Sequence, residues 1–329
     1  MSRIMDTREY PARIALVVLI VIGFAIAFMG VERPVANRSV SVVAISSSSK
    51  LFAAGTPTGE ISVWTNGRDR LPQQFRSSDG ELNDIQFSPD EHWLAIANRN
   101  LTTYKIGDLR QSHSIRSDGD NYGSVRFRQE GKALLVIKGT GAIETVDFES
   151  GKPIVTICCS TIYGEVALTP NDAMIVNAGH WPGLWDVSSG RPVARLTESR
   201  EVMTFRPIGF DRTAANVYMG SQDGRVYRWD VVSRRMLGRS PAQENYVDAL
   251  AVIRTGWVAY AGFGKPLRLW NPDTSMTRSI PEAVPTSNLI VDADGKSVMF
   301  GTAAGTIEVW DTTTGHRTEQ VAIPRIRPH

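Results

Sequence analysis

The sequence of 329 residues contains only two cysteines, and they are adjacent, at Cys158 and Cys159. This pair excludes a disulfide framework, and no cysteine–histidine spacing fits a zinc site. We expect one side chain to pack inward and the other to point outward along a strand, with a strained bond between them as the alternative. No metal and no cofactor are therefore predicted.

The sequence also lacks an excess of charge, with 36 Lys and Arg against 34 Asp and Glu. No overall field would attract nucleic acid, so a nucleic-acid partner is not expected.

Histidine is scarce as well, with five residues in the whole chain. No nucleophile elbow and no glycine-rich phosphate loop occur, so the sequence predicts no enzyme. A catalytic triad stays an open alternative, because its parts converge only in space.

One long apolar run, residues 14–31, carries no charge. As a helix it would span roughly 27 Å, close to the ~30 Å hydrocarbon core of a bilayer. We interpret it as an uncleaved signal anchor, a single transmembrane helix; the alternatives are a cleaved signal peptide and a buried soluble helix. Three arginines precede the run and two closely follow it. This bias predicts a cytoplasmic N-terminus, with the rest of the chain on the extracytoplasmic (periplasmic) side of a cell (inner) membrane.

The rest of the chain is periodic. A strand that ends in an aromatic or apolar residue followed by a polar one recurs seven times, in steps of 39 to 44 residues. The strand-ending residues are Trp64, Tyr104, Val146, Trp185, Trp229, Trp270 and Trp310. The steps match the ~40–45-residue period of four-stranded propeller blades, and closing the ring buries both faces of each blade. The sequence therefore predicts an all-β, seven-bladed β-propeller rather than a β-sandwich, with the last four tryptophans buried against the neighbouring blade.

Three tracts resemble repeats of a known family. The turn Phe87-Ser88-Pro89-Asp90, the tract from Gly220 to Gly224 that leads to Trp229-Asp230, and the ending Val309-Trp310-Asp311 are similar to WD40 repeats. The resemblance covers roughly residues 38–324. It implies a rigid ring that serves as a binding platform, typically for proteins or peptides. The Gly-His pair of strong WD40 repeats is absent, so we expect blade-to-blade rigidity to depend more on apolar packing than on polar networks.

The domain boundaries follow from these features. They are a tail at 1–13, the anchor at 14–31, a short linker at 32–38, the propeller of four-stranded antiparallel blades at 39–324 and a C-terminal tail at 325–329. Many WD40 propellers complete the last blade with an N-terminal strand. Here the first inner strand begins at about Val40, and residues 318–323 can supply the last outer strand. The seventh blade is therefore expected to come wholly from the C-terminal part of the chain.

The loops between second and third strands emerge on one face of a WD40-like ring, together with the inter-blade connections. They hold the candidate partner-binding residues Arg99, Lys138, His180, Trp181, Asp223, Phe263 and Lys265. Trp181 and Phe263 are the predicted apolar centre, since interface energy concentrates in aromatic and arginine anchors. Arg99, Lys138 and Lys265 form the predicted basic rim. The alternative is that each aromatic side chain folds back onto its own blade.

Together these features favour a membrane-anchored protein–protein interaction scaffold, or a subunit of a membrane complex, that binds one or more proteins on one propeller face. The alternative is an exported propeller enzyme, a hydrolase or a quinone-dependent oxidoreductase, with its site at the central channel. Quinone-dependent dehydrogenases of this kind have eight blades and need a tryptophan shortly after an Asp-x-x-Thr-Gly hairpin. The hairpins that end at Gly151, Gly190 and Gly315 lack it.

Overall fold

A computed structural model describes residues 39–324, with gaps at 66–70, 78, 117–120, 129, 158–164, 170, 179–181, 197–204 and 293. The predicted anchor at 14–31, the linker at 32–38 and the pair Cys158-Cys159 lie outside the described residues. Within the described part of the chain, no helix is long and apolar enough to cross a membrane.

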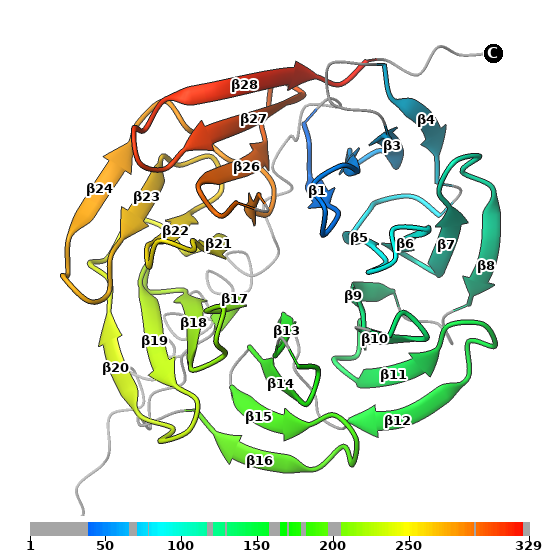
Figure 1. Cartoon of the computed structure of the whole chain (residues 1–329), viewed down its shortest axis with the longest axis horizontal. Helices are drawn as coiled ribbons and strands as arrows, with labels where there is room; N and C mark the ends of the chain where they lie inside the picture. The colour runs from blue at the N-terminus through cyan, green and yellow to red at the C-terminus, as the bar shows by residue number, and fades with distance from the viewer. Residues whose placement is uncertain are drawn as a thin grey trace, which may run out of the picture. The chain divides into compact units, whose positions relative to one another are not determined.

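The described residues form seven four-stranded antiparallel sheets. Figure 1 shows these sheets as blades around a common centre, each with its first strand inside and its fourth strand outside. The colour runs once around the ring from blue to red, so consecutive blades in the chain are neighbours in space. The predicted all-β, seven-bladed propeller is confirmed.

The strands occupy four concentric positions. The inner strands are β1 (Val42–Ile45), β5 (Asp84–Phe87), β9 (Tyr122–Phe127), β13 (Val166–Leu168), β17 (Phe205–Phe210), β21 (Ala249–Val252) and β25 (Ile290–Val291). The second strands are β2 (Phe52–Gly55), β6 (Trp93–Ala97), β10 (Ala133–Lys138), β14 (Met174–Asn177), β18 (Asn216–Ser221), β22 (Val258–Ala261) and β26 (Ser297–Gly301). The third strands are β3 (Glu60–Trp64), β7 (Leu101–Lys105), β11 (Ile143–Asp147), β15 (Gly183–Asp186), β19 (Val226–Asp230), β23 (Leu267–Trp270) and β27 (Thr306–Asp311). The outer strands are β4 (Gln73–Arg76), β8 (Gln111–Ile115), β12 (Pro153–Ile157), β16 (Pro192–Arg195), β20 (Met236–Arg239), β24 (Thr277–Ile280) and β28 (Arg317–Ala322).

The seven strand-ending residues occupy one register in the third strands. Each pairs with an apolar residue of the second strand in its blade: Trp64 with Phe52, Tyr104 with Leu94, Val146 with Leu134, Trp185 with Ile175, Trp229 with Val217, Trp270 with Val258 and Trp310 with Val298. The period in the sequence is therefore the period of the third strands, where a large side chain fills the space between two blades.

The core is divided into clusters that each join two neighbouring blades. Trp310 of blade 7 packs with Leu267 and Leu269 of blade 6, and Trp64 of blade 1 packs with Ile307 of blade 7. This arrangement agrees with the expectation that apolar packing holds the blades together.

Three of the four tryptophans expected to be buried are buried, namely Trp229, Trp270 and Trp310, each at most 5% exposed. Trp185 is only half-buried, which differs from the expectation. Its indole N–H donates to Asn177 Oδ1 at 2.8 Å, so a polar contact as well as packing fixes this ring.

Blade 7 consists of β25 to β28 in chain order, so its four described strands all come from the C-terminal part of the chain, as expected. Blades 7 and 1 are joined by hydrogen bonds and side-chain contacts. The Asn288 amide bonds to both backbone groups of Val43, and Val40 N donates to Thr302 O at 3.1 Å. A Cβ at Gly301 would overlap the side chain of Val40, so this junction requires a glycine.

Candidate functional site

The loops between second and third strands share one face of the ring with the inter-blade connections; we call it the loop face. In blade 6, Phe263 N donates to the Asp248 carboxylate at 2.9 Å, and Gly264 N donates to Pro285 O at 3.1 Å. Lys265 Nζ lies 3.6 Å from the Glu244 carboxylate. Asp248 and Glu244 belong to the connection from blade 5, and Pro285 belongs to the connection to blade 7. These contacts fix the loop between its two neighbouring connections.

Asp223, Phe263 and Lys265 gather around the connection 241–248. Asp223 accepts hydrogen bonds from the Tyr227 hydroxyl at 2.7 Å and from Arg225 N at 3.1 Å. Burial raises the pKa of Tyr227 and the Asp223 carboxylate raises it further, so the hydroxyl remains a donor at neutral pH. Phe263 is half-buried, and the Lys265 side chain is 42% exposed. We call these three residues the blade 5–6 group.

The other candidates come from blades 2 to 4. Arg99 is exposed in the loop between β6 and β7. Lys138 ends β10, and its ammonium is 2.9 Å from Glu144 with only 19% of the side chain exposed. His180 and Trp181 lie outside the described residues. The patch that would join these residues to the blade 5–6 group remains a prediction.

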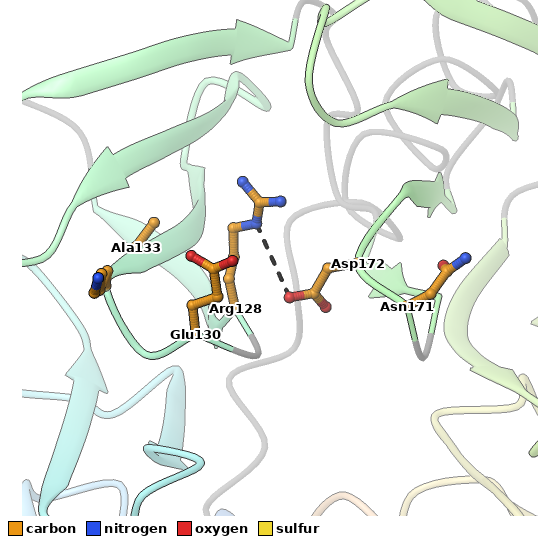
Figure 2. A pocket seen from close by; sticks show the side chains of 6 residues that line it. Arg128, Glu130, Ala133, Asn171 and Asp172 are labelled. Atoms are coloured by element: carbon orange, nitrogen blue, oxygen red, sulfur yellow. Dashed lines mark ion pairs between the residues drawn. The ribbon is translucent and has the colours of Figure 1, made fainter.

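Two adjoining cavities lie on other parts of the ring, near the turns between first and second strands. The first has a volume of about 350 Å³ and is lined by Arg128, Glu130 and Lys132 of blade 3 and by Asn171 and Asp172 of blade 4. Figure 2 shows the ion pair between Arg128 and Asp172 across the gap between these turns, with Nε 4.0 Å from the carboxylate. We call the face of the ring that carries these turns the turn face.

The second cavity, of about 330 Å³, shares Asp172 with the first. Its other walls include Gln86, Arg126, Ala167 and Ile208, from the inner strands of blades 2 to 5. It therefore opens on the inner wall of the ring, where mixed polar and apolar side chains meet.

Arg126 on this wall is bound to the neighbouring blade. Its guanidinium donates to the Asp84 carboxylate, which also accepts from Ser124 Oγ at 2.6 Å and Val125 N at 3.1 Å. Burial lowers the pKa of Arg126, but Asp84 and Glu165 outweigh this effect and raise it, so the group stays charged. Its charge serves to join blade 2 to blade 3.

The sequence analysis did not single out Arg126, Arg128 or Asp172. A signal for Arg126 was present, because a charged residue interrupts the apolar inner strand Ser-Val-Arg-Phe. Across the described ranges, no group of three or more His, Cys, Asp or Glu side chains is placed to hold a metal ion.

No protein-family model matches the chain. The chain is similar to Periodic tryptophan protein 2 of Saccharomyces cerevisiae, with 21% identity over 291 residues, which cover 84% of this chain and 31% of that protein. It is also similar to Pre-mRNA-splicing factor cwf17 of Schizosaccharomyces pombe, with 24% identity over 112 residues, 33% of each protein. The chain thus spans about a third of the length of the curated relatives that it matches.

Proposed function

We propose that this seven-bladed propeller is a protein-interaction scaffold of the WD40-repeat type, which binds a partner protein on its loop face. The fold alone does not fix a function, so the proposal depends on the loops themselves. The main support for the proposal is that polar contacts with Asp248, Glu244 and Pro285 hold the blade 6 loop in place. A loop held in place before binding loses less conformational entropy when a partner arrives.

The chemistry of the blade 5–6 group suits a protein surface. Phe263 offers an apolar contact, while Asp223, Lys265 and Glu244 place both signs of charge around it. An apolar centre with a polar rim is the usual anatomy of a protein–protein interface. The partner is therefore a protein with a small apolar projection surrounded by polar groups of both signs.

We also propose that residues 14–31 anchor the chain in the cell (inner) membrane, with the propeller on the extracytoplasmic side as a subunit of a membrane complex. The support comes from the sequence: an uncharged run of bilayer length and a bias of arginines toward its N-terminal side. The proposed partners are then other proteins of that complex.

The loop face is tested by affinity purification of the full chain from detergent-solubilised membranes of its native cells. The variant Phe263→Ala/Lys265→Ala should lose most of a specific partner, about tenfold in recovery, since truncated hot-spot residues commonly weaken binding by that order. Trp181→Ala tests the predicted centre in the same way. The matched control is Glu130→Ala/Lys132→Ala on the turn face, which should recover the partner fully. Equal recovery with all variants, each folded by circular dichroism, would exclude the loop face.

A further inference from the structure

Several large apolar side chains remain exposed on the outside of blades 3 to 6. They are Ile154, Val193, Met236, Leu237 and Met276, which are 36% to 60% exposed. The position of Met236, which pairs with Trp229, is held by Gln111 in blade 2 and by Arg317 in blade 7. At this register blade 5 therefore exposes an apolar side chain where blades 2 and 7 expose polar ones.

Blade 5 combines this apolar surface with positive charge. Residues 232–239, which we call the edge tract, read Val-Ser-Arg-Arg-Met-Leu-Gly-Arg and contain no acidic residue. Arg234, Arg235 and Arg239 are all exposed, and Val232 is 85% exposed. The tract thus presents apolar and cationic side chains together along one strand.

The edge tract includes β20, the outermost strand of its sheet, which pairs with β19 on one side. Ser240 N donates to Val226 O at 2.8 Å, so the backbone groups of residue 240 point toward β19. In an antiparallel ladder the direction alternates, and Arg239 therefore points its N–H and C=O away from the sheet. Such an edge is a template for another strand.

Gly238 in the middle of β20 has no role inside the ring. A Cβ there would meet no atom within 4 Å, and the residue is not in the left-handed region. The corresponding outer-strand residues of blades 3, 4 and 7 are Val155, Ala194 and Glu319. Glycine weakens a strand, and it is typical of places where another backbone approaches closely. Gly238 therefore leaves the face of β20 uncovered at this point, where a side chain of an added strand can pack.

We infer that the edge tract binds an extended, acidic segment of a partner protein, which adds a fifth strand to blade 5. Backbone hydrogen bonds to the open edge supply affinity, and alternate side chains supply specificity. Apolar residues of the segment contact Leu237 and Met236, while its carboxylates meet Arg235 and Arg239. A second copy of this chain is a poor occupant, because two edge tracts would set arginines against arginines.

The binding test uses the full chain in detergent and two fluorescent ten-residue peptides, in which Val alternates with Glu or with Lys. The Glu peptide should bind and the Lys peptide should not. Gly238→Val and Arg235→Glu/Arg239→Glu should each weaken binding of the Glu peptide about tenfold or more. Ala194→Val, at the same register of blade 4, is the matched control and should leave the affinity unchanged.

Two readouts separate strand addition from other causes. Gly238→Val should melt at the same or a higher temperature than the wild type, because the added side chain enters open space. Hydrogen exchange should show that the Glu peptide protects the amide of Arg239. Binding that survives Gly238→Val but not the arginine variants, absence of protection, or binding only to anionic lipid vesicles would overturn the inference. The variant Phe263→Ala/Lys265→Ala of the loop face does not change this strand. Failure of the loop-face proposal can therefore be distinguished from failure of the edge-tract inference.

Discussion

The side-chain amide of Asn288 makes a pair of hydrogen bonds with the backbone of Val43, accepting from its N–H and donating to its C=O at 2.9 Å each. The two residues are 245 positions apart and belong to blades 7 and 1. Blades 2 and 3 use the same device, because Asp84 and Gln86 accept from Val125 N and Phe127 N. Side chains in or just before one inner strand thus bond to the backbone of the inner strand of the next blade.

Replacing Asn288 with Leu should weaken the closure of the ring. Two hydrogen bonds are lost at Val43, a buried residue, so we expect the free energy of unfolding to fall by about 1–3 kcal/mol. Chemical denaturation of the purified chain measures the change. Asn121→Leu, in an exposed part of the connection before β9, is the control and should stay within about 0.5 kcal/mol of the wild type. Equal effects of the two variants would contradict a role of Asn288 in closure.

The tryptophans of the third strands should differ in their contributions. Trp229→Ala and Trp310→Ala should each destabilise the ring by about 3–5 kcal/mol, as for large buried aromatic residues. Trp185→Ala should be milder, because that ring is half-buried. Denaturant midpoints of the three variants test this order. Losses under about 1 kcal/mol for the first two would show that their burial does not hold the blades together.

The indole N–H groups add a finer test. Trp310 Nε1 donates to the buried Glu308 at 2.9 Å, whereas Trp229 Nε1 is buried without a hydrogen-bond partner among the described residues. Replacement by Phe removes buried volume at both sites and should therefore be costlier at Trp310 than at Trp229, since only the first also removes a hydrogen bond from a buried carboxylate. Thermal melting of Trp229→Phe and Trp310→Phe compares them directly, and a reversed order would contradict this explanation.

The hairpin carboxylate Asp186 should contribute to acid sensitivity. Hydrogen bonds from Ser189 and Ser188 lower its pKa from 3.8 to about 2. A lowered pKa in the folded chain means that the stabilisation is complete above the ordinary pKa and is lost as the pH falls toward about 2. Asp186→Asn should therefore flatten the fall of melting temperature between about pH 4 and 2. Glu149→Gln, which removes one exposed charge from another hairpin, should leave that slope unchanged.

Truncation at the two ends should have opposite results. Deleting residues 317–329 removes β28 and exposes the edge of β27, so we expect unfolding or aggregation. Deleting residues 1–36 removes nothing from the compact unit that begins at Asn37, and the ring should stay folded. Size-exclusion chromatography and circular dichroism distinguish the outcomes. A ring that fails only after the N-terminal deletion would reveal a closing strand from that end.

The proposed anchor predicts that residues 14–31 remain in the mature protein and keep it in the membrane. These residues carry no charge, and as a helix they would match the thickness of the hydrocarbon core of a bilayer. Intact-mass measurement of the protein from its native cells, together with fractionation, tests this point. A mature N-terminus near Phe28 in the soluble fraction would establish a cleaved signal peptide instead.

The sequence was sufficient for the architecture because the blades repeat a local pattern. The spacing from Trp64 to Trp310 is the spacing of the third strands, and the last outer strand was expected from the tract at 318–323. The position of loops such as the one at Phe263 also followed from topology, because alternate loops emerge on opposite faces.

Contacts between blades could not be derived in this way. Asp84 and Arg126 are 42 residues apart, and nothing in a local pattern shows that one side chain reaches the other across two inner strands. The same holds for Asn288 with Val43, and for the cavity between the turns at Arg128 and Asp172. These features depend on how neighbouring blades are placed, which periodicity leaves undetermined.

A ring whose last blade consists of four consecutive strands, as the described residues 39–324 show, has a defined mechanical behaviour. Where a strand from one end of the chain completes the last blade, tension must shear a whole ladder of backbone hydrogen bonds at once. Here a pull on the two ends of the described ring loads the junction of blades 7 and 1, with the hydrogen bonds of Asn288 and Val40 and the packing of Trp64 on Ile307. This junction should therefore open first, while the other blade interfaces remain intact. In an assembly under mechanical load, this propeller would open at the junction of blades 7 and 1.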